Sequence, residues 1–361
     1  MIRAKLASLF RILFVEKPTH SYTITYEMRG EKRVIKGCIV DDKEKKTEMN
    51  KFYRVLILLL CSASLKGYAQ QAFTYTQFID NLTPINHAWS VTQEGSAVNV
   101  LSRKQWVGID GAPMTVMANG YMPISGQNAT VGFTMLSDKV AIENLTEVNL
   151  FGAKSVRLSD ETYLAVGLNF GFRNYEALYS QLDPNDPEVI NGDVIESRAN
   201  VGASVMMYMP GGVGRSLPGS LYVGVSIPRI AFRTLGAGST GTTVNQKNFY
   251  FFTAGYNYPV TPDIDWNSAA VVAYTANLPV QADFSTKMWF NHALGVGLNY
   301  RASNEIAVLS SFKTGNVNIG YSYQFGASST KLAGFNRGTH EVSISLRFGN
   351  SGSSMEKIPF R

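Results

Sequence analysis

The chain has 361 residues, of which 45% are hydrophobic, 12% aromatic and only 17% charged, and 32 are glycine. A charged fraction below the ~25% that is usual for soluble domains favours a β-rich protein with one face in an apolar medium. The formal net charge of +6 does not indicate nucleic-acid binding, because residues 1–69 hold 14 basic and 7 acidic residues, and the remainder has 33 − 14 = 19 basic and 27 − 7 = 20 acidic ones, a net of −1.

The first 69 residues combine a charged extension with an export signal. Within 49–69, two basic residues precede a short apolar core and a small-residue site that ends at Ala69. This pattern predicts a secretory signal peptide cleaved after Ala69. Its core is shorter than the ~20 residues of a membrane-spanning helix. We expect residues 1–48 to be a gene-model extension ahead of a start at Met49, or a disordered charged segment.

Both cysteines, Cys38 and Cys61, lie in this leader. A mature chain without cysteine has no disulfides, no catalytic thiolate and no Cys-ligated zinc. Residues 70–94 follow the leader, and we expect them to lie either inside the fold as a plug or at its periplasmic mouth.

The rest of the mature chain alternates with period two. In residues 162–174, 293–301, 316–325 and 340–348, large apolar side chains fall on one face, and small, polar or charged ones on the other. Such alternation predicts β-strands. It divides residues 95–348 into fourteen strands near 95–106, 112–124, 128–139, 144–156, 162–179, 197–209, 220–228, 247–259, 265–277, 279–290, 292–302, 304–313, 316–326 and 338–348.

Strand length and number indicate where these strands reside. Many are long enough to cross a bilayer at a tilt, which takes ~9–11 residues, and fourteen is even, as is usual for single-chain outer-membrane barrels. Strands span lipid only in a closed barrel, because every backbone N–H and C=O must be paired. We therefore predict an all-β protein, a transmembrane outer-membrane β-barrel of about 14 antiparallel strands, followed by a polar tail at 349–361.

Aromatic residues near strand ends are expected to form girdles at the two membrane interfaces. They are Trp106, Tyr121, Tyr258, Trp266, Trp289, Phe290 and Phe348.

The search for chemistry predicts no catalytic residue, no metal site and no cofactor, and hence no enzyme. The histidines of the mature chain, His87, His292 and His340, lack metal-ligand spacing. The pair His340–Glu341 has no nucleophile beside it in any motif, so a structural or partner-binding role is favoured. The sequence DPNDP at 183–187 is interpreted as a turn rather than a calcium site.

The least ordinary stretch is RKQWVGIDGAPMT at 103–115, between the first two predicted strands. Its glycines and proline predict a tight turn, which we expect at the periplasmic end because periplasmic turns are short. Two interpretations remain: a structural hairpin, or a surface that docks a partner. The candidate residues are Arg103, Gln105, Trp106, Gly108, Gly111 and Pro113, together with His340 and Glu341.

These motifs resemble the PorP/SprF family of type IX secretion system membrane proteins. The resemblance spans residues 70–348 and rests on 103–115, on LSDK at 136–139, on DPNDP and on GTHE at 338–341. The chain departs from the family near the mature N-terminus, where His87 replaces the usual proline.

The resemblance implies a non-enzymatic outer-membrane protein that works with type IX secretion machinery. Its partners would be that machinery, membrane lipids and a cargo protein with a C-terminal sorting domain, such as an adhesin of gliding motility, which it would help to export or retain at the cell surface. The alternative is an outer-membrane pore for a small solute, similar to fatty-acid transporters. An internal plug at 70–94 would distinguish the two.

Overall fold

The computed structural model describes residues 22–29, 32–40, 74–181, 193–212, 216–234, 248–325 and 338–349. The expected signal peptide at 49–69, the DPNDP motif and the tail beyond Gly349 lie outside these residues. The chain divides into two units, residues 1–65 and 66–361. In the first unit, β1 (Tyr22–Arg29) and β2 (Lys32–Val40) pair as an antiparallel hairpin.

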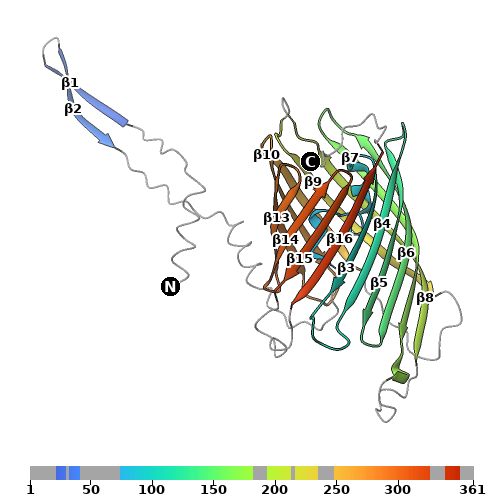
Figure 1. The fold of residues 1–361 in the computed structure, drawn as a ribbon. Helices are drawn as coiled ribbons and strands as arrows, with labels where there is room; N and C mark the ends of the chain where they lie inside the picture. The colour runs from blue at the N-terminus through green and yellow to red at the C-terminus, as the bar shows by residue number, and fades with distance from the viewer. Residues whose placement is uncertain are drawn as a thin grey trace. The chain divides into compact units, whose positions relative to one another are not determined.

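The second unit is a closed barrel of fourteen antiparallel strands (Figure 1), which confirms the predicted fold class. Each strand pairs with its neighbours in sequence, and β16 pairs with β3 to close the wall. The strands are β3 (Ser96–Lys104), β4 (Met114–Ile124), β5 (Ala129–Val140), β6 (Glu143–Arg157), β7 (Tyr163–Ala177), β8 (Val194–Met209), β9 (Ser220–Thr234), β10 (Tyr250–Thr261), β11 (Ile264–Tyr274), β12 (Gln281–Phe290), β13 (Leu294–Arg301), β14 (Glu305–Thr314), β15 (Val317–Gln324) and β16 (Thr339–Phe348).

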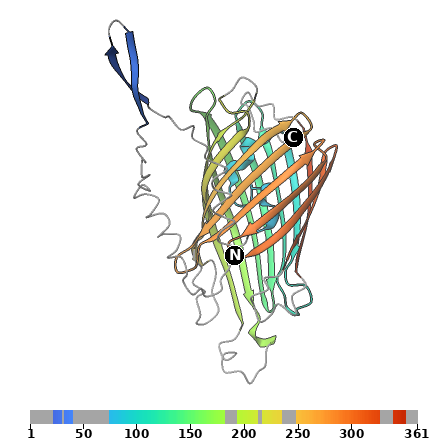
Figure 2. The same cartoon turned by 90° about the vertical axis from the view of Figure 1, so that its left-hand side faces the viewer.

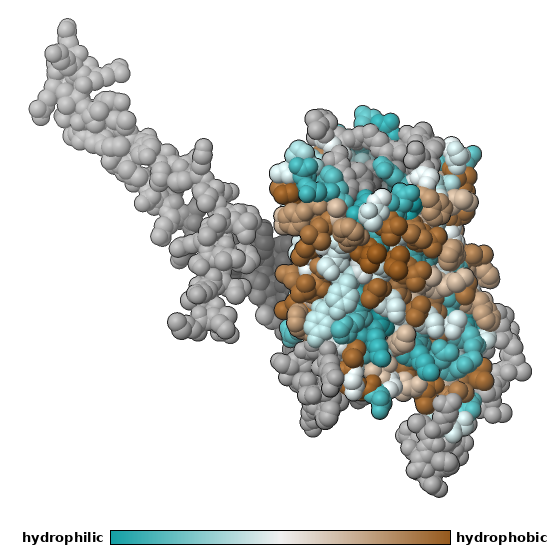
Figure 3. All heavy atoms as spheres, in the orientation of Figure 1, coloured by the Kyte–Doolittle hydropathy of each residue, from teal (hydrophilic) through white to brown (hydrophobic). Residues whose placement is uncertain are grey.

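Period-two alternation decides which side chains face outward. In β13, Leu294 and Leu298 are about half exposed, whereas Asn299 and Arg301, which follow them on the opposite face, are buried. Successive side chains of a strand point to opposite faces, so the apolar set forms the outer wall and the small and polar set lines the lumen. Figure 3 shows apolar residues gathered over the middle of the outer wall.

Two of the aromatic residues assigned to the membrane girdles lie instead in the lumen. Tyr121 is 5% exposed and Trp289 is 1% exposed. Trp289 is two residues after the inward-facing Lys287 and so shares its face. Trp266, Phe290 and Phe348 do face outward. Position near a strand end is therefore insufficient to place an aromatic at the interface; its parity within the strand decides.

The two ends of the barrel differ in their connections. The connections that follow the odd-numbered strands from β3 to β15 emerge at one end of the barrel. We call this the long-connection end because it includes 178–193, 235–249 and 325–338. The opposite, short-connection end carries 125–128, 262–263 and 315–316. Outer-membrane barrels direct their longer loops to the exterior. The turn at 105–113 emerges at the long-connection end rather than among the short connections, on which the expected periplasmic placement rested.

Residues 74–94, which we call the lumen segment, lie within the barrel. They contain two short 3-10 helices, η1 (Thr76–Ile79) and η2 (His87–Thr92), visible between the strands in two perpendicular views (Figures 1 and 2). Most residues of the lumen segment, including Tyr75, Phe78 and Trp89, are buried. Within the described residues, no helix has the length and hydrophobicity needed to cross a membrane.

Candidate functional site

The lumen segment runs from one end of the barrel to the other. The carbonyl of Thr74 accepts a hydrogen bond of 2.6 Å from Arg103, next to the last residue of β3 at the long-connection end. The side chain of Gln93 accepts one of 3.4 Å from Arg347, next to the last residue of β16 at the short-connection end. From Thr74 to Gln93 the segment therefore runs from the long-connection end to the opposite end, where β3 begins.

Glu341 of β16 holds the start of the segment. Its carboxylate accepts the backbone N–H groups of Thr76 at 3.0 Å and Gln77 at 2.8 Å. The amide of Gln77 donates to the carbonyl of Glu341 at 3.2 Å and accepts from Ser343 at 2.7 Å. The Glu341 carboxylate lies 3.7 Å from the guanidinium of Arg103, and both side chains are almost fully buried. Such a desolvated pair requires partners for each of its polar atoms, and the segment backbone supplies several.

A second arginine completes this contact, and we call Arg103, Arg301 and Glu341 the outer anchor. Arg301 of β13 donates to the hydroxyl of Thr74 at 3.0 Å and to the carboxylate of Asp283 at 2.7 Å. The neighbouring Tyr75 is fully buried, and burial, followed by the charge of Glu341, raises the pKa of its phenol well above the ordinary value. The outer anchor therefore binds neutral backbone and hydroxyl groups with charged side chains, which form the stronger class of hydrogen bond.

One further ion pair lies midway along the segment. Lys287 of β12 is fully buried and donates to the carboxylate of Asp80 at 2.5 Å and to the hydroxyl of Ser311 at 2.9 Å. Its ammonium also lies 5.5 Å from the ring centroid of Trp289. Lys287 thereby contacts both the segment, through Asp80, and the barrel wall, through Ser311.

Between Asn81 and Thr92, the contacts that hold the segment come from neutral groups. The backbone N–H of Ala88 donates to Ser204 at 3.0 Å, and the carbonyl of Ile85 accepts from Ser226 at 2.6 Å. The rings of Trp89 and Tyr222 pack with centroids 4.7 Å apart. Hydrogen bonds of this kind contribute about 1 kcal/mol each, so apolar packing accounts for much of the stability with which this part of the segment is docked.

Within residues 81–93, His87 is the one ionisable residue. It is 1% exposed, its ring centroid lies 4.7 Å from that of Phe151, and neither ring nitrogen has a hydrogen-bond partner. Burial, helped by the positive charge of Arg229, lowers the pKa of His87 from 6.5 to about 3. The imidazole is therefore neutral at physiological pH.

The structure brings the two sequence motifs together. Arg103 and Glu341 are register partners on β3 and β16. Beyond them, the N–H of Val107 donates to the carbonyl of Gly338 at 3.0 Å, and the N–H of Trp106 donates to the hydroxyl of Thr339 at 3.4 Å. The stretches 103–115 and 338–341 therefore form one continuous structure at the long-connection end.

The other candidates are placed differently. Gly108 and Gly111 have φ values of 99° and 71°, a region that disfavours side chains, and both are exposed. Trp106 also has a positive φ, 46°. Pro113 is buried and its carbonyl accepts the N–H of Gln105 at 2.9 Å. These residues thus form a turn whose half-buried Gln105 and Trp106 reach its surface.

His340 does not act with Glu341, because neighbouring residues of a strand face opposite sides of the wall. Its Nδ1 lies 2.8 Å from the hydroxyl of Tyr321, and its ring makes an edge-on contact with Tyr323. Among the residues that the structure describes, no group of three or more His, Cys, Asp or Glu side chains is arranged to hold a metal ion.

Sequence reasoning missed Lys287, Asp80, Arg301 and Asp283 as parts of the site. Each carries a charge, and the three barrel residues fall on the inward face of their strands. A charge on the lumen face of a strand is therefore the signal that could have selected the three, whereas Asp80 carries no periodic pattern.

A family model described as type IX secretion system membrane protein PorP/SprF matches residues 67–346. No curated protein matches the chain. Among solved structures, it is similar to the TodX deltaS2S3 mutant monoaromatic hydrocarbon channel, with 10% identity, a TM-score of 0.44 and coverage of 80% of this chain and 98% of that one. It is also similar to the Ralstonia pickettii toluene transporter TbuX, with 10% identity, a TM-score of 0.41 and coverage of 78% and 96%.

Proposed function

Because the chain belongs to the PorP/SprF family of type IX secretion system membrane proteins, and is an outer-membrane barrel associated with that system, we propose that it helps to export cargo proteins or to retain them at the cell surface. The cargo is a secreted protein with a C-terminal sorting domain, such as an adhesin. The role is one of binding and positioning, and the proposal includes no catalytic step.

The filled lumen is the observation that carries this proposal. A solute pore needs a continuous path, whereas here the lumen segment is held along its length by buried contacts, from Thr74 to Gln93. Removing a partner from a buried ion pair such as Arg103–Glu341 costs about 3–5 kcal/mol. Opening a path through this lumen would therefore break several costly contacts at once, which disfavours the rival function of a transport pore.

The long-connection end is the surface we assign to the partner. It carries the turn at 105–113 and the longest connections of the barrel, and the rule for outer-membrane barrels directs it to the exterior. Lys104, Asp110 and Met114 are exposed there beside the half-buried Trp106. Tryptophan is among the residues that are enriched in binding hot spots.

A deletion strain tests the function. We expect one or a few large proteins to disappear from the cell surface, measured by surface labelling and mass spectrometry, while uptake of small solutes stays normal. Unchanged surface proteins combined with a lost uptake activity would overturn the proposal in favour of the pore.

A pair of matched variants tests the surface. In the double variant Gln105→Ala/Asp110→Ala, we expect display of the cargo per folded barrel to fall severalfold. The control is Asp263→Ala, an exposed aspartate in the short turn at the opposite end, which should leave display unchanged. Equal display in both variants would remove this turn from the partner surface.

A further inference from the structure

The lumen wall formed by β6, β7, β8 and β9 carries charges that the lumen segment does not use. Glu147, Arg173 and Arg198 are successive register partners across β6, β7 and β8, so their side chains form one row. Glu196 of β8 binds Arg198 with its carboxylate. All four point into the same part of the barrel, toward the long-connection end.

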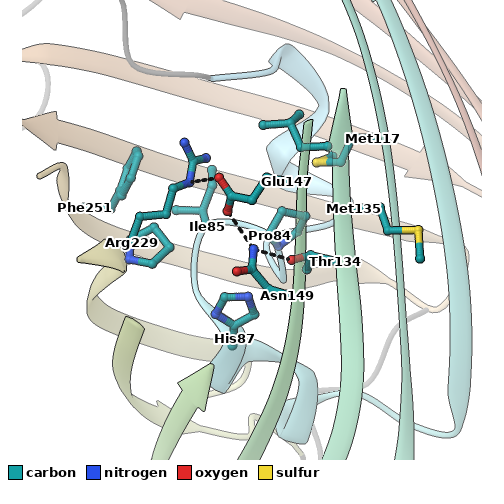
Figure 4. A pocket seen from close by; sticks show the side chains of 12 residues that line it. Pro84, Ile85, His87, Met117, Thr134, Met135, Glu147, Asn149, Arg229 and Phe251 are labelled. Carbon is teal, nitrogen blue, oxygen red and sulfur yellow. Dashed lines mark hydrogen bonds and ion pairs between the residues drawn. The ribbon is translucent and has the colours of Figure 1, made fainter. Parts of the chain in front are cut away.

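An irregularity in β9 adds a third guanidinium to this row. The pairing of β8 with β9 shifts register between Val201 and Ala203, opposite the stretch that contains Pro228 and Arg229. Such bulges redirect side chains. Arg229 thereby reaches into the lumen and contacts the carboxylate of Glu147 at 3.1 Å, as Figure 4 shows.

This row contains three arginines, but only two of them form ion pairs with the carboxylates of Glu147 and Glu196. Arg229 is paired with Glu147, and Arg198 with Glu196. Arg173 has no ion pair among the residues that the structure describes, and its Nε is buried without a hydrogen-bond partner. The next acidic residue toward the rim of β6 is Glu143, which hydrogen-bonds the side chain of Tyr175. Arg173 is partly buried and lies opposite Glu147, which already pairs with Arg229, so this row holds one more cation than its two carboxylates neutralise.

Unpartnered amide groups lie in the row next to this cation, because Asn149 and Asn200 both pair in register with Gly171, two residues from Arg173. Asn200 is 2% exposed, and both polar atoms of its side chain are buried without hydrogen-bond partners. The side-chain oxygens of Asn149 and Asn169 and both ring nitrogens of His87 are likewise buried and unpartnered. Native structures leave few buried polar groups unpaired, so a cluster of such groups can form further hydrogen bonds. The set contains both donors and acceptors.

A cavity adjoins the cluster. Its volume is about 30 Å³, and it lies between the lumen segment and the wall, lined by His87, Glu147, Asn149 and Arg229 (Figure 4). Arg229 keeps 26% of its side chain exposed, and Arg198 keeps 12%. The partly exposed guanidinium of Arg229 therefore lies at the edge of this cavity.

We propose that this cluster binds a carboxylate carried by a peptide. Arg173 supplies the charge for the carboxylate, since a guanidinium presents a planar set of donors that matches it, and the amide nitrogen of Asn200 donates beside it. The unpartnered oxygens of Asn149 and Asn169 accept an N–H from the same peptide. The proposal does not depend on the role in secretion, because it concerns only the chemistry of the lumen.

Calorimetric titration of the full-length barrel in detergent tests the proposal. The probes are N-acetyl-triglycine with a free C-terminus, the same peptide as its amide, and N-acetyl-Gly-Asp-Gly-amide, all at one ionic strength. Binding by the first identifies a C-terminal carboxylate and binding by the third a side-chain carboxylate, and either supports the site. The amide of triglycine should not bind. No binding by either acid, or equal binding by the triglycine amide, would overturn the proposal.

Two variants and a control make the result specific. Arg173→Gln should abolish binding, and Asn200→Ala should weaken it about tenfold, the effect of one hydrogen bond to a charged group. Asn200 has no side-chain partner to lose, so this variant tests the site even if the first fails to fold. Arg157→Gln, at an exposed arginine paired with Asp160 near the short-connection end, should bind normally. Equal peptide affinity in Asn200→Ala and Arg157→Gln would contradict the assignment of Asn200 to the site. If sodium acetate binds as tightly as the peptides, the site recognises a carboxylate but not a peptide.

Discussion

The two halves of the lumen segment are held by different chemistry. Residues 74–80 contact buried charges, namely the outer anchor and Lys287. Residues 81–92 contact hydroxyls, amides and aromatic rings, such as Ser204, Ser226 and Tyr222, and Gln93 at the far end contacts Arg347. A charged contact tolerates little displacement, because an uncompensated buried charge costs several kcal/mol. Neutral contacts lose about 1 kcal/mol each. The first half therefore determines where the segment sits, and the second half fills space around that position.

The largest expected effect is that of Glu341→Gln. It neutralises the acceptor of two backbone N–H groups and leaves Arg103 without its carboxylate, so docking of residues 74–80 should weaken by about 3–5 kcal/mol. Hydrogen exchange of the Thr76 and Gln77 amides measures it. Glu305→Gln, at the partly exposed carboxylate 3.4 Å from Arg301, serves as control. Unchanged exchange in Glu341→Gln would show that charge does not position the first half.

Lys287→Met should have the next largest effect. It removes the charged donor to Asp80, which retains some solvent contact at 11% exposure, so the loss should be about 2–3 kcal/mol. The double variant Lys287→Met/Asp80→Asn should recover part of this loss, because no unpaired charge remains. Measured in a double-mutant cycle, a coupling energy near zero would contradict a role for this pair.

Acidification should loosen the second half. Below pH 6.5, the imidazole of a released His87 takes up a proton, whereas the docked imidazole stays neutral until its pKa of about 3. The released state therefore gains relative stability as pH falls from 6.5 toward 3, by about 2 kcal/mol at pH 5. Exchange of the amides of residues 86–92 at pH 7 and pH 5 measures it. The same pH dependence in His87→Phe would assign the effect to another group.

The smallest effect is expected for Ser204→Ala. The N–H of Ala88 loses one acceptor but keeps the side-chain oxygen of Asn86 at 3.1 Å, so docking should weaken by about 1 kcal/mol or less. The comparison with Glu341→Gln is the sharpest test of the two-half description. A loss in Ser204→Ala as large as that in Glu341→Gln would refute it.

The wall of the barrel could be predicted from sequence because its pattern is local. Alternation in β13 and β16 reflects the two faces of one strand, so each strand was expected near its observed position, including β14 at Glu305–Thr314. The β9 strand was expected to end near residue 228 but continues to Thr234. The bulge at Pro228–Arg229 interrupts the alternation there, and a proline within a strand pattern favours an end.

The contacts of the site could not be predicted because they join residues that are distant in sequence. Nothing in 103–115 shows that Arg103 lies beside Glu341, since that proximity arises only when β16 meets β3. The lumen segment lacks any periodic pattern, so its two expected positions, inside the barrel or at its mouth, could not be separated. Its 3-10 helices are too short to give a periodic signal.

The pairing of β16 with β3 has a consequence for the order of folding. Glu341 and Arg103 face each other across this seam, and Glu341 also binds Thr76, 265 residues away in the chain. Contacts of such separation form late, since a long loop must close before they contribute any stability. The carboxylate that positions the start of the segment is thus supplied by the strand synthesised last. A barrel in which β16 has not yet paired with β3 lacks the contacts between Glu341 and the lumen segment. Docking of residues 74–80 therefore marks completed assembly of the barrel.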